Sequence, residues 1–172
     1  MKNSLWHVGL CILFMWGSFF VSRIFPLNQF GIIPRTTQGL VGVIAAPFLH
    51  GNLNHIVSNT IALITFIPFF ILLEGRNAIE KIVVLVLGTG FLTWCLARPS
   101  VHIGASGLVF ALYGYLIALG FFQKKILLMA VSIFLISSYG YLIFGISPFQ
   151  RGISWESHLF GLFSGILLAK YS

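Results

Sequence analysis

Charged residues are scarce in this chain of 172 residues, and acidic ones are the scarcest, with three Asp and Glu against ten Lys and Arg. Charged residues make up 8% of the chain and apolar residues 58%, whereas an average soluble domain carries roughly 25% charged residues. So few charges cannot cover the surface of a soluble domain, and the mean hydropathy of +1.00 excludes a disordered chain. A polytopic membrane protein remains.

Basic clusters and paired cysteines are also lacking. Although the formal net charge is +7, Lys124 and Lys125 are the only adjacent basic residues, so the sequence lacks a basic patch for nucleic-acid phosphates. We therefore expect no nucleic-acid partner. The two cysteines, Cys11 and Cys95, lie in apolar runs, which indicates two buried thiols and no disulfide framework.

Long uncharged runs separate the few charges and predict six membrane-spanning helices, since a span needs about 20 mostly apolar residues. The expected fold class is therefore an all-α membrane protein, one domain over residues 1–172 without an appended soluble domain. No small-x-small cleavage site follows the first run, so we expect it to be a permanent helix. The expected helices are Leu5–Ile24, His55–Leu73, Ile79–Ala97, Ser106–Phe122, Ile126–Phe144 and Ser154–Tyr171.

The connection from Pro26 to Asn54 is much longer than the others. It contains the run Gly39–Phe48, which is too short to cross a bilayer and too apolar for an aqueous loop. We expect this first loop to be partly embedded, with the run in the interface or in the outer leaflet.

The basic residues favour an orientation with both termini in the cytoplasm, by the positive-inside rule. For a bacterial protein, the membrane is then the plasma (inner) membrane. With this orientation the inner side holds six basic residues and the outer side four. They are Lys2, Arg76, Lys81, Lys124, Lys125 and Lys170 inside, and Arg23, Arg35, Arg98 and Arg151 outside.

Polar residues near the start of the even-numbered spans form the candidate site. His55 and Asn59 open the second span, Ser106 opens the fourth, and His158 lies one turn into the sixth. Because the even-numbered spans all run from outside to inside, these residues share a depth in the outer half of the membrane. Ionisable groups at membrane depth are costly and indicate a functional site by default.

Ser106 lies in the sequence Gly104-Ala-Ser106-Gly107. A serine that starts a helix is often an N-cap, and that interpretation stays open. The flanking glycines permit the close backbone approach that a nucleophile facing a substrate needs. A helix N-terminus also presents free N–H groups to a developing oxyanion.

Small residues repeat every four positions near His158 and along the fourth span, and such stripes let membrane helices pack closely. If these two spans pack together, Ser106 and His158 meet near the outer end of the contact. A histidine bonded to a backbone carbonyl is the alternative interpretation of His158. The stripes are Ser157, Gly161, Gly165 and Ala169 in the sixth span, and Gly107, Ala111, Gly114 and Ala118 in the fourth.

A serine within hydrogen-bond reach of a histidine is the minimal activated nucleophile. A carboxylate often orients the histidine, but Glu74 and Glu80 belong to the inner side. Glu156 lies two residues before His158, which is about 200° around a helix. The sequence therefore predicts a dyad rather than a triad.

His55 and Asn59 are four residues apart and share one helical face. Both can donate hydrogen bonds, which suits an oxyanion pocket. Helix-end capping by His55 and interhelical bonding by Asn59 are the alternatives. His50 and His55 are five residues apart, off a common helical face, with no Cys or carboxylate nearby, so we expect neither a metal nor another cofactor.

Three motifs in this order, each opening an even-numbered span, resemble the rhomboid family of intramembrane serine proteases over nearly the whole chain. They are His50-Gly-Asn-Leu-Asn-His55-Ile-Val-Ser-Asn59, Gly104-Ala-Ser106-Gly107 and His158-Leu-Phe-Gly161-Leu-Phe-Ser-Gly165. The resemblance implies a six-helix rhomboid-like bundle with a water-accessible site open to the outer side.

The resemblance also implies roles. Ser106 is the expected nucleophile and His158 the general base, while His55, Asn59 and the backbone N–H of Ser106 form the oxyanion hole. The implied function is a serine endopeptidase that cleaves transmembrane segments of membrane proteins within the bilayer. The alternatives are a non-catalytic rhomboid-like binder of transmembrane helices and, less in keeping with polar groups on one side only, a small channel or carrier.

The chain departs from the family pattern at two places. Many rhomboids carry Tyr four residues after the serine, where this chain has Phe110, which can stack on the histidine without a hydrogen bond. The first loop lacks a Trp-Arg pair and has Gly31-Ile-Ile-Pro-Arg35 instead. Glu74 lies where members often carry a structural Glu. The expected supporting residues are Gly104, Gly107, Phe110, Gly161 and His50; the sequence does not indicate an oligomeric state.

Overall fold

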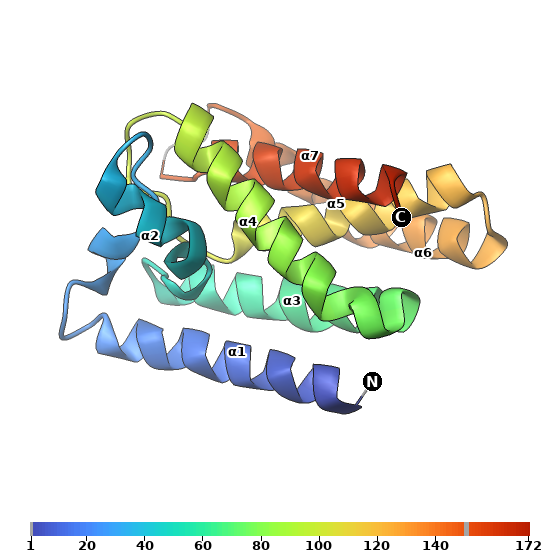
Figure 1. Ribbon diagram of the computed structural model, residues 1–172, viewed down its shortest axis with the longest axis horizontal. Coiled ribbons are helices and arrows are strands. Elements are labelled where there is room, and N and C mark those ends of the chain that lie inside the picture. Colours follow the sequence, from blue (N-terminus) through green and yellow to red (C-terminus); the bar gives the residue numbers. More distant parts are fainter. Residues whose placement is uncertain (1, 150–151) are drawn as a thin grey trace.

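The computed structural model describes residues 2–149 and 152–172 as a bundle of helices (Figure 1). In the described residues, β pairing is limited to a bridge between Ile32 and His102. The prediction of an all-α bundle is confirmed. Arg151, which was predicted on the outer side, lies outside the described residues. The helices are α1 (Lys2–Val21), α2 (Thr37–Ala45), α3 (Leu53–Glu74), α4 (Ala78–Leu96), α5 (Ser106–Gln123), α6 (Ile126–Tyr139) and α7 (Trp155–Lys170), with 3-10 turns η1 (Leu27–Phe30), η2 (Ala46–Phe48), η3 (Gly75–Asn77) and η4 (Gly140–Ile146).

Three helical stretches of the described chain are long and apolar enough to cross a membrane. They are Leu53–Leu96, Ser106–Gln123 and Ile126–Ile146. The first is a pair of helices, α3 and α4, which meet at Gly75, where φ is +59°. α1 contributes a shorter apolar helix, Trp6–Val21, and α7 has 16 residues, so their crossing of the membrane stays a prediction.

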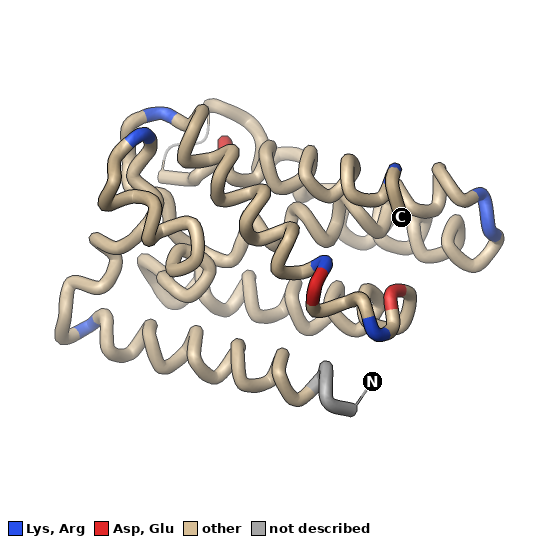
Figure 2. Tube along the Cα trace, in the orientation of Figure 1, with Lys and Arg blue, Asp and Glu red and all other residues tan. Residues whose placement is uncertain are grey.

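Charged residues gather at the two ends of the bundle and leave its middle uncharged (Figure 2). Both chain termini lie at the same end (Figure 1). This distribution is typical of a protein whose apolar middle faces hydrocarbon, because a charge in that region is costly.

The long first loop folds into α2 and η2, a helical element that the sequence did not predict. Thr36 caps the start of α2, since its side chain accepts a hydrogen bond from the backbone N–H of Gly39 at 3.0 Å. α2 packs against α4, and η2 against α1. Arg35 donates to the carbonyl oxygens of Cys95 and Ala97 at 3.1 and 2.8 Å. The loop thereby satisfies carbonyls at the end of α4 that have no helical partner.

α5 is the centre of the bundle, in contact with α3, α4, α6 and α7. Its most extensive contact is with α7, as the stripes of small residues predict. A Cβ atom on Gly161 would overlap the carbonyl oxygen of Gly107, and one on Gly165 would overlap that of Ala111. Glycine therefore lets the two backbones touch and sets the position of α7 along α5.

Gly161→Ala is expected to destabilise the fold by about 1–3 kcal/mol, the usual effect of overpacking a tight contact. The added methyl group meets the backbone of Gly107, which cannot move aside as a flexible side chain can. Thermal unfolding in detergent measures the change.

Gly88→Ala is the matched control, because a Cβ there would lie 3.7 Å from the Ser164 hydroxyl, an ordinary contact. Equal melting temperatures for Gly161→Ala and the wild type would contradict the close packing of α5 and α7.

At the end of the bundle opposite the first loop, a polar cluster joins α3, α4 and α5. Glu74 accepts hydrogen bonds from the Tyr115 hydroxyl and from Lys81. Lys81 also donates to Tyr115 at 3.0 Å and to Ser172 at 2.9 Å. The cluster satisfies the hydroxyl of the fully buried Tyr115, in keeping with the structural role that the resemblance implies for Glu74.

The prediction of two buried thiols is wrong. Cys11 is exposed and Cys95 is half-buried, and both are free. α1 contacts the rest of the bundle mainly through α3 and η2, so most of its surface faces outward. In a membrane protein the lipid-facing surface is as apolar as the interior, and the sequence pattern of an apolar run does not separate the two.

Candidate active site

Ser106 and His158 lie side by side at the start of α5 and in the first turns of α7. The Ser106 Oγ is 2.8 Å from the His158 Nε2. Ser106 is the first residue of α5, and the N-cap position belongs to Ala105. The interpretation of Ser106 as an N-cap is therefore wrong, since its hydroxyl is engaged by a histidine.

The tautomer of His158 follows from its second hydrogen bond. Its Nδ1 lies 2.8 Å from the carbonyl oxygen of Gly145. A carbonyl oxygen only accepts hydrogen bonds, so Nδ1 carries the proton and Nε2 is the acceptor for the Ser106 hydroxyl. The carbonyl interpretation of His158 is thus correct for Nδ1, and the serine contact is present at Nε2.

Aromatic stacking holds the plane of the His158 ring. Phe110, one turn after Ser106 on α5, stacks on it with centroids 4.3 Å apart and an angle of 6° between the rings. A Cβ atom on Gly145 would lie 2.8 Å from the Phe110 ring and 3.2 Å from the His158 Nδ1. Glycine at this position lets the backbone carbonyl approach the imidazole.

No carboxylate of the described residues forms a hydrogen bond with His158. Glu156 is buried, and its carboxylate faces Arg98, with the Arg98 Nε at 3.5 Å and the Arg98 backbone nitrogen at 3.4 Å. The arrangement is a serine–histidine dyad whose histidine is oriented by a backbone carbonyl.

His55 and Asn59 lie on α3 beside the loop that leads to Ser106. The backbone N–H of His55 donates to the Asn52 side chain at 2.9 Å, so Asn52 caps α3 and the capping interpretation of His55 is wrong. The Asn59 Nδ2 donates to the Nε2 of His50 at 2.9 Å, and the Ala105 backbone N–H lies 3.5 Å from the same atom. The buried His50 therefore joins Asn59 to the residue before Ser106.

Gly104 brings the loop before Ser106 against His55 and Asn59 of α3. Its φ is +113°, a conformation that favours glycine. A Cβ atom here would overlap the His55 ring and lie 3.5 Å from the Asn59 Nδ2. The expected supporting residues Gly104 and His50 thus border both the serine and the two candidate oxyanion donors.

The dyad opens onto a cavity of about 930 Å³. Ser106, His158, His55, Asn59 and Phe110 all line it. Among the described residues, no group of three His, Cys, Asp or Glu side chains is placed to hold a metal ion. The chemistry that these groups offer is attack by a serine hydroxyl whose proton passes to an adjacent imidazole.

Residues 37–172 match the Rhomboid domain family. The chain belongs to the rhomboid family. It is similar to uncharacterized proteins of Mycobacterium bovis and Mycobacterium tuberculosis, at 35% identity over 154 residues for each, which covers 83% of this chain and 63% of theirs. An uncharacterized protein of Mycobacterium leprae is 32% identical over 153 residues, or 83% of this chain and 60% of that protein. The chain thus spans less than two thirds of the length of these curated relatives.

The family match marks the chain as an integral membrane protein, and it includes every candidate site residue, from His50 to Gly161. α1 precedes the matched region. The rhomboid domain therefore holds the complete candidate site within α2 to α7 and their loops.

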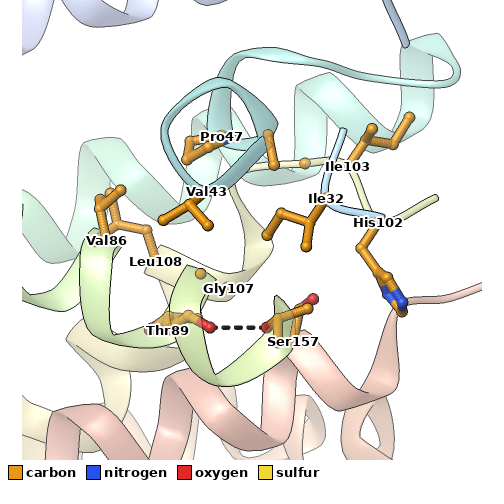
Figure 3. Close-up of a pocket in the computed structure, with 14 residues that line it drawn as sticks. Ile32, Val43, Pro47, Val86, Thr89, His102, Ile103, Gly107, Leu108 and Ser157 are labelled. Atoms are coloured by element: carbon orange, nitrogen blue, oxygen red, sulfur yellow. Dashed lines mark hydrogen bonds between the residues drawn. The ribbon is translucent and has the colours of Figure 1, made fainter. Parts of the chain in front are cut away.

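A second, smaller cavity of about 30 Å³ lies behind Gly107 in the rhomboid domain, between α4, α7 and the first loop (Figure 3). Thr89, Gly107 and Ser157 surround it, and the Thr93 hydroxyl donates to the Thr89 carbonyl at 2.8 Å. A Cβ atom on Gly107 would meet the Thr89 methyl group at 3.0 Å. The absence of a side chain at Gly107 therefore lets α4 pack closely against the first turn of α5.

One member of the site, Gly145, was not predicted from the sequence. It lies in η4, inside an apolar run with no polar side chain to mark it. It contributes a backbone carbonyl, which every residue carries. In the sequence, only a glycine between the fifth and sixth predicted spans could have indicated this position.

Proposed function

We propose that this rhomboid protein is a serine endopeptidase that cleaves transmembrane segments of membrane proteins within the bilayer. The observation that carries the proposal is the 2.8 Å contact between Ser106 Oγ and His158 Nε2, with the imidazole proton placed on Nδ1 by the Gly145 carbonyl. That tautomer leaves the lone pair of Nε2 directed at the hydroxyl that must lose its proton.

The first half of the reaction forms an acyl-enzyme. The Ser106 oxygen attacks the scissile carbonyl carbon while its proton moves to the His158 Nε2. The developing oxyanion receives hydrogen bonds from the Ser106 backbone N–H and from the His55 and Asn59 side chains. His158 then gives the proton to the leaving amine, and the peptide C–N bond breaks.

The second half releases the product. His158 takes a proton from a water molecule, the hydroxide attacks the acyl carbon, and the Ser106 oxygen leaves with the proton returned by His158. The Gly145 carbonyl stabilises the transient imidazolium through the Nδ1–H. A carbonyl dipole stabilises an imidazolium less than a carboxylate does. In this proposal the Gly145 carbonyl takes the place of the buried acid of a triad.

The substrates in this proposal are single-pass membrane proteins with small, helix-weakening residues near the cut. The scissile backbone must leave its helix before Ser106 can reach it, and helical hydrogen bonds oppose that step in lipid. The relatives are bacterial, and the proposed location is the plasma membrane with both termini cytoplasmic, so that the site opens to the outer side.

Cleavage of a transmembrane substrate in liposomes tests the proposal against the alternative of a non-catalytic binder. The substrate carries one transmembrane segment, and mass spectrometry locates the cut. Cleavage within or beside the segment by wild-type protein, and none by Ser106→Ala, is expected. Co-purification of the intact substrate with wild-type protein, without cleavage, would support the binder and overturn the protease.

A further inference from the structure

A second serine–histidine contact lies beside the dyad, in the loops that lead into α5 and α7. The Nδ1 of His102 forms a hydrogen bond with the Oγ of Ser154. His102 precedes Ser106 by four residues, and Ser154 precedes His158 by four. The contact therefore joins the two segments from which the dyad residues project.

His102 is held on three sides. Its backbone N–H and carbonyl pair with Ile32 at 2.9 Å each, and its Nε2 lies 3.1 Å from the carbonyl oxygen of Arg98. Its side chain is buried, and Figure 3 shows the imidazole directed toward the chain that leads into α7. The backbone of His102 is thus fixed to the first loop, and its ring is bonded to the Arg98 carbonyl within the α4–α5 loop.

These partners determine the direction of each hydrogen bond. The Arg98 carbonyl only accepts, so the His102 Nε2 carries the proton and Nδ1 accepts from the Ser154 hydroxyl. Ser157, whose Oγ is 3.2 Å from that of Ser154, must then donate to Ser154. Burial lowers the pKa of His102, against the opposing effects of the Arg98 carbonyl and the Glu156 charge, which favours the neutral ring that this pattern needs.

A backbone hydrogen bond connects Ser154 to His158. The Ser154 carbonyl accepts the backbone N–H of His158 at 3.2 Å, in the first turn of α7. Arg98 supports the same segment, since its guanidinium donates to the Ile153 carbonyl at 2.7 Å. The start of α7 is therefore attached to the loop that ends at Ser106, in addition to the glycine contacts deeper in the bundle.

We propose that His102 and Ser154 are positioning residues that hold His158 in register with Ser106, and we call their contact the His102–Ser154 clasp. The clasp acts on the orientation of the imidazole. Both side chains also line the cavity onto which the dyad opens, so separate values of kcat and KM are needed to distinguish this effect from substrate contact. Its catalytic consequence rests on the proposed protease function. A displacement of about 1 Å between reacting groups can lower a rate about 100-fold, so a hydroxyl outside the dyad has a measurable effect on kcat.

Ser154→Thr and Ser154→Val test the clasp, because the two side chains share one shape and differ in the hydroxyl group. In liposomes, we expect Ser154→Thr to keep kcat within about 2-fold of wild type. Ser154→Val is expected to lower kcat by about 10- to 100-fold with KM nearly unchanged. Ser137→Thr and Ser137→Val form the control pair, since Ser137 is exposed on α6 and bonds only within its own helix.

A kcat for Ser154→Val equal to that of Ser154→Thr would overturn the clasp. So would a change confined to KM, which indicates substrate contact, or a loss of kcat that follows the fraction of unfolded protein.

A readout independent of activity separates the two proposals. In ¹⁵N-histidine NMR spectra, the Nδ1–H tautomer of His158 is expected in wild type and Ser154→Thr and is expected to be partly lost in Ser154→Val. If wild type cleaves no substrate, the protease proposal fails, and these spectra still decide the clasp: identical His158 signals in all three proteins would overturn it.

Discussion

Ser106→Ala and His158→Ala are each expected to lower kcat for a transmembrane substrate by about 10⁴-fold or more, as is usual for members of a catalytic unit. The Ser106 hydroxyl donates to the His158 Nε2 across 2.8 Å, so the proton transfer that activates the serine needs both groups. Residues that act as a unit show non-additive losses, and the double variant is therefore expected to be no slower than either single one. Initial rates in liposomes measure the three values.

Ser137→Ala is the control for the serine, because its exposed hydroxyl bonds only to carbonyls of its own helix. Its rate is expected to match wild type. A loss of kcat in the double variant equal to the product of the two single losses would show that Ser106 and His158 act in separate steps. Substantial cleavage by Ser106→Ala would exclude it as the nucleophile.

Asn59→Ala is expected to lower kcat by about 10²- to 10³-fold with little change in KM, the usual effect of removing one oxyanion donor. The oxyanion exists only in the transition state and the tetrahedral intermediate, so the loss falls on kcat. The His50 bond to the Asn59 Nδ2 uses one amide hydrogen and leaves the other for the substrate. Steady-state kinetics with a transmembrane substrate separates the two constants.

Asn77→Ala is the matched control, since Asn77 is exposed in η3 at the opposite end of the bundle. It is expected to keep the wild-type kcat. A raised KM with unchanged kcat in Asn59→Ala would assign Asn59 to ground-state binding and contradict its place in the oxyanion hole.

The sequence was informative where function requires a polar side chain at membrane depth. Ser106, His158, His55 and Asn59 stand out because polar and ionisable groups are costly near the start of an apolar span. The spacing of the small residues around Gly161 then predicted which helices meet, and α5 and α7 do form the most extensive contact. Burial of backbone against backbone needs glycine, and glycine is visible in a sequence.

The sequence was uninformative where a backbone group or an irregular loop positions the site residues. The Gly145 carbonyl orients His158, yet no side chain marks it. α2 lies within a loop whose apolar run predicted a position in the interface or in the outer leaflet, without a helix. His102 and Ser154 meet through two loops with no periodicity, so their four-residue offsets from the dyad acquire meaning only once the fold is known.

Cys11 shows a different limit. Its apolar surroundings predicted burial, and the side chain is exposed on α1. In water an apolar run and a buried face coincide, because the hydrophobic effect drives them together. In lipid that force between helices is absent, and only small or polar residues identify the faces that pack.

Labelling with a fluorophosphonate, followed by mapping of the adduct by mass spectrometry, tests whether Ser106 is a nucleophile activated by His158. The reagent forms a covalent bond with an activated serine oxygen, and among the side chains that the structure describes, Ser106 and Ser154 are bonded to histidines. We expect one adduct, on Ser106, that is lost in both Ser106→Ala and His158→Ala. An unlabelled wild-type protein, or an adduct on Ser154 that persists in Ser106→Ala, would contradict it.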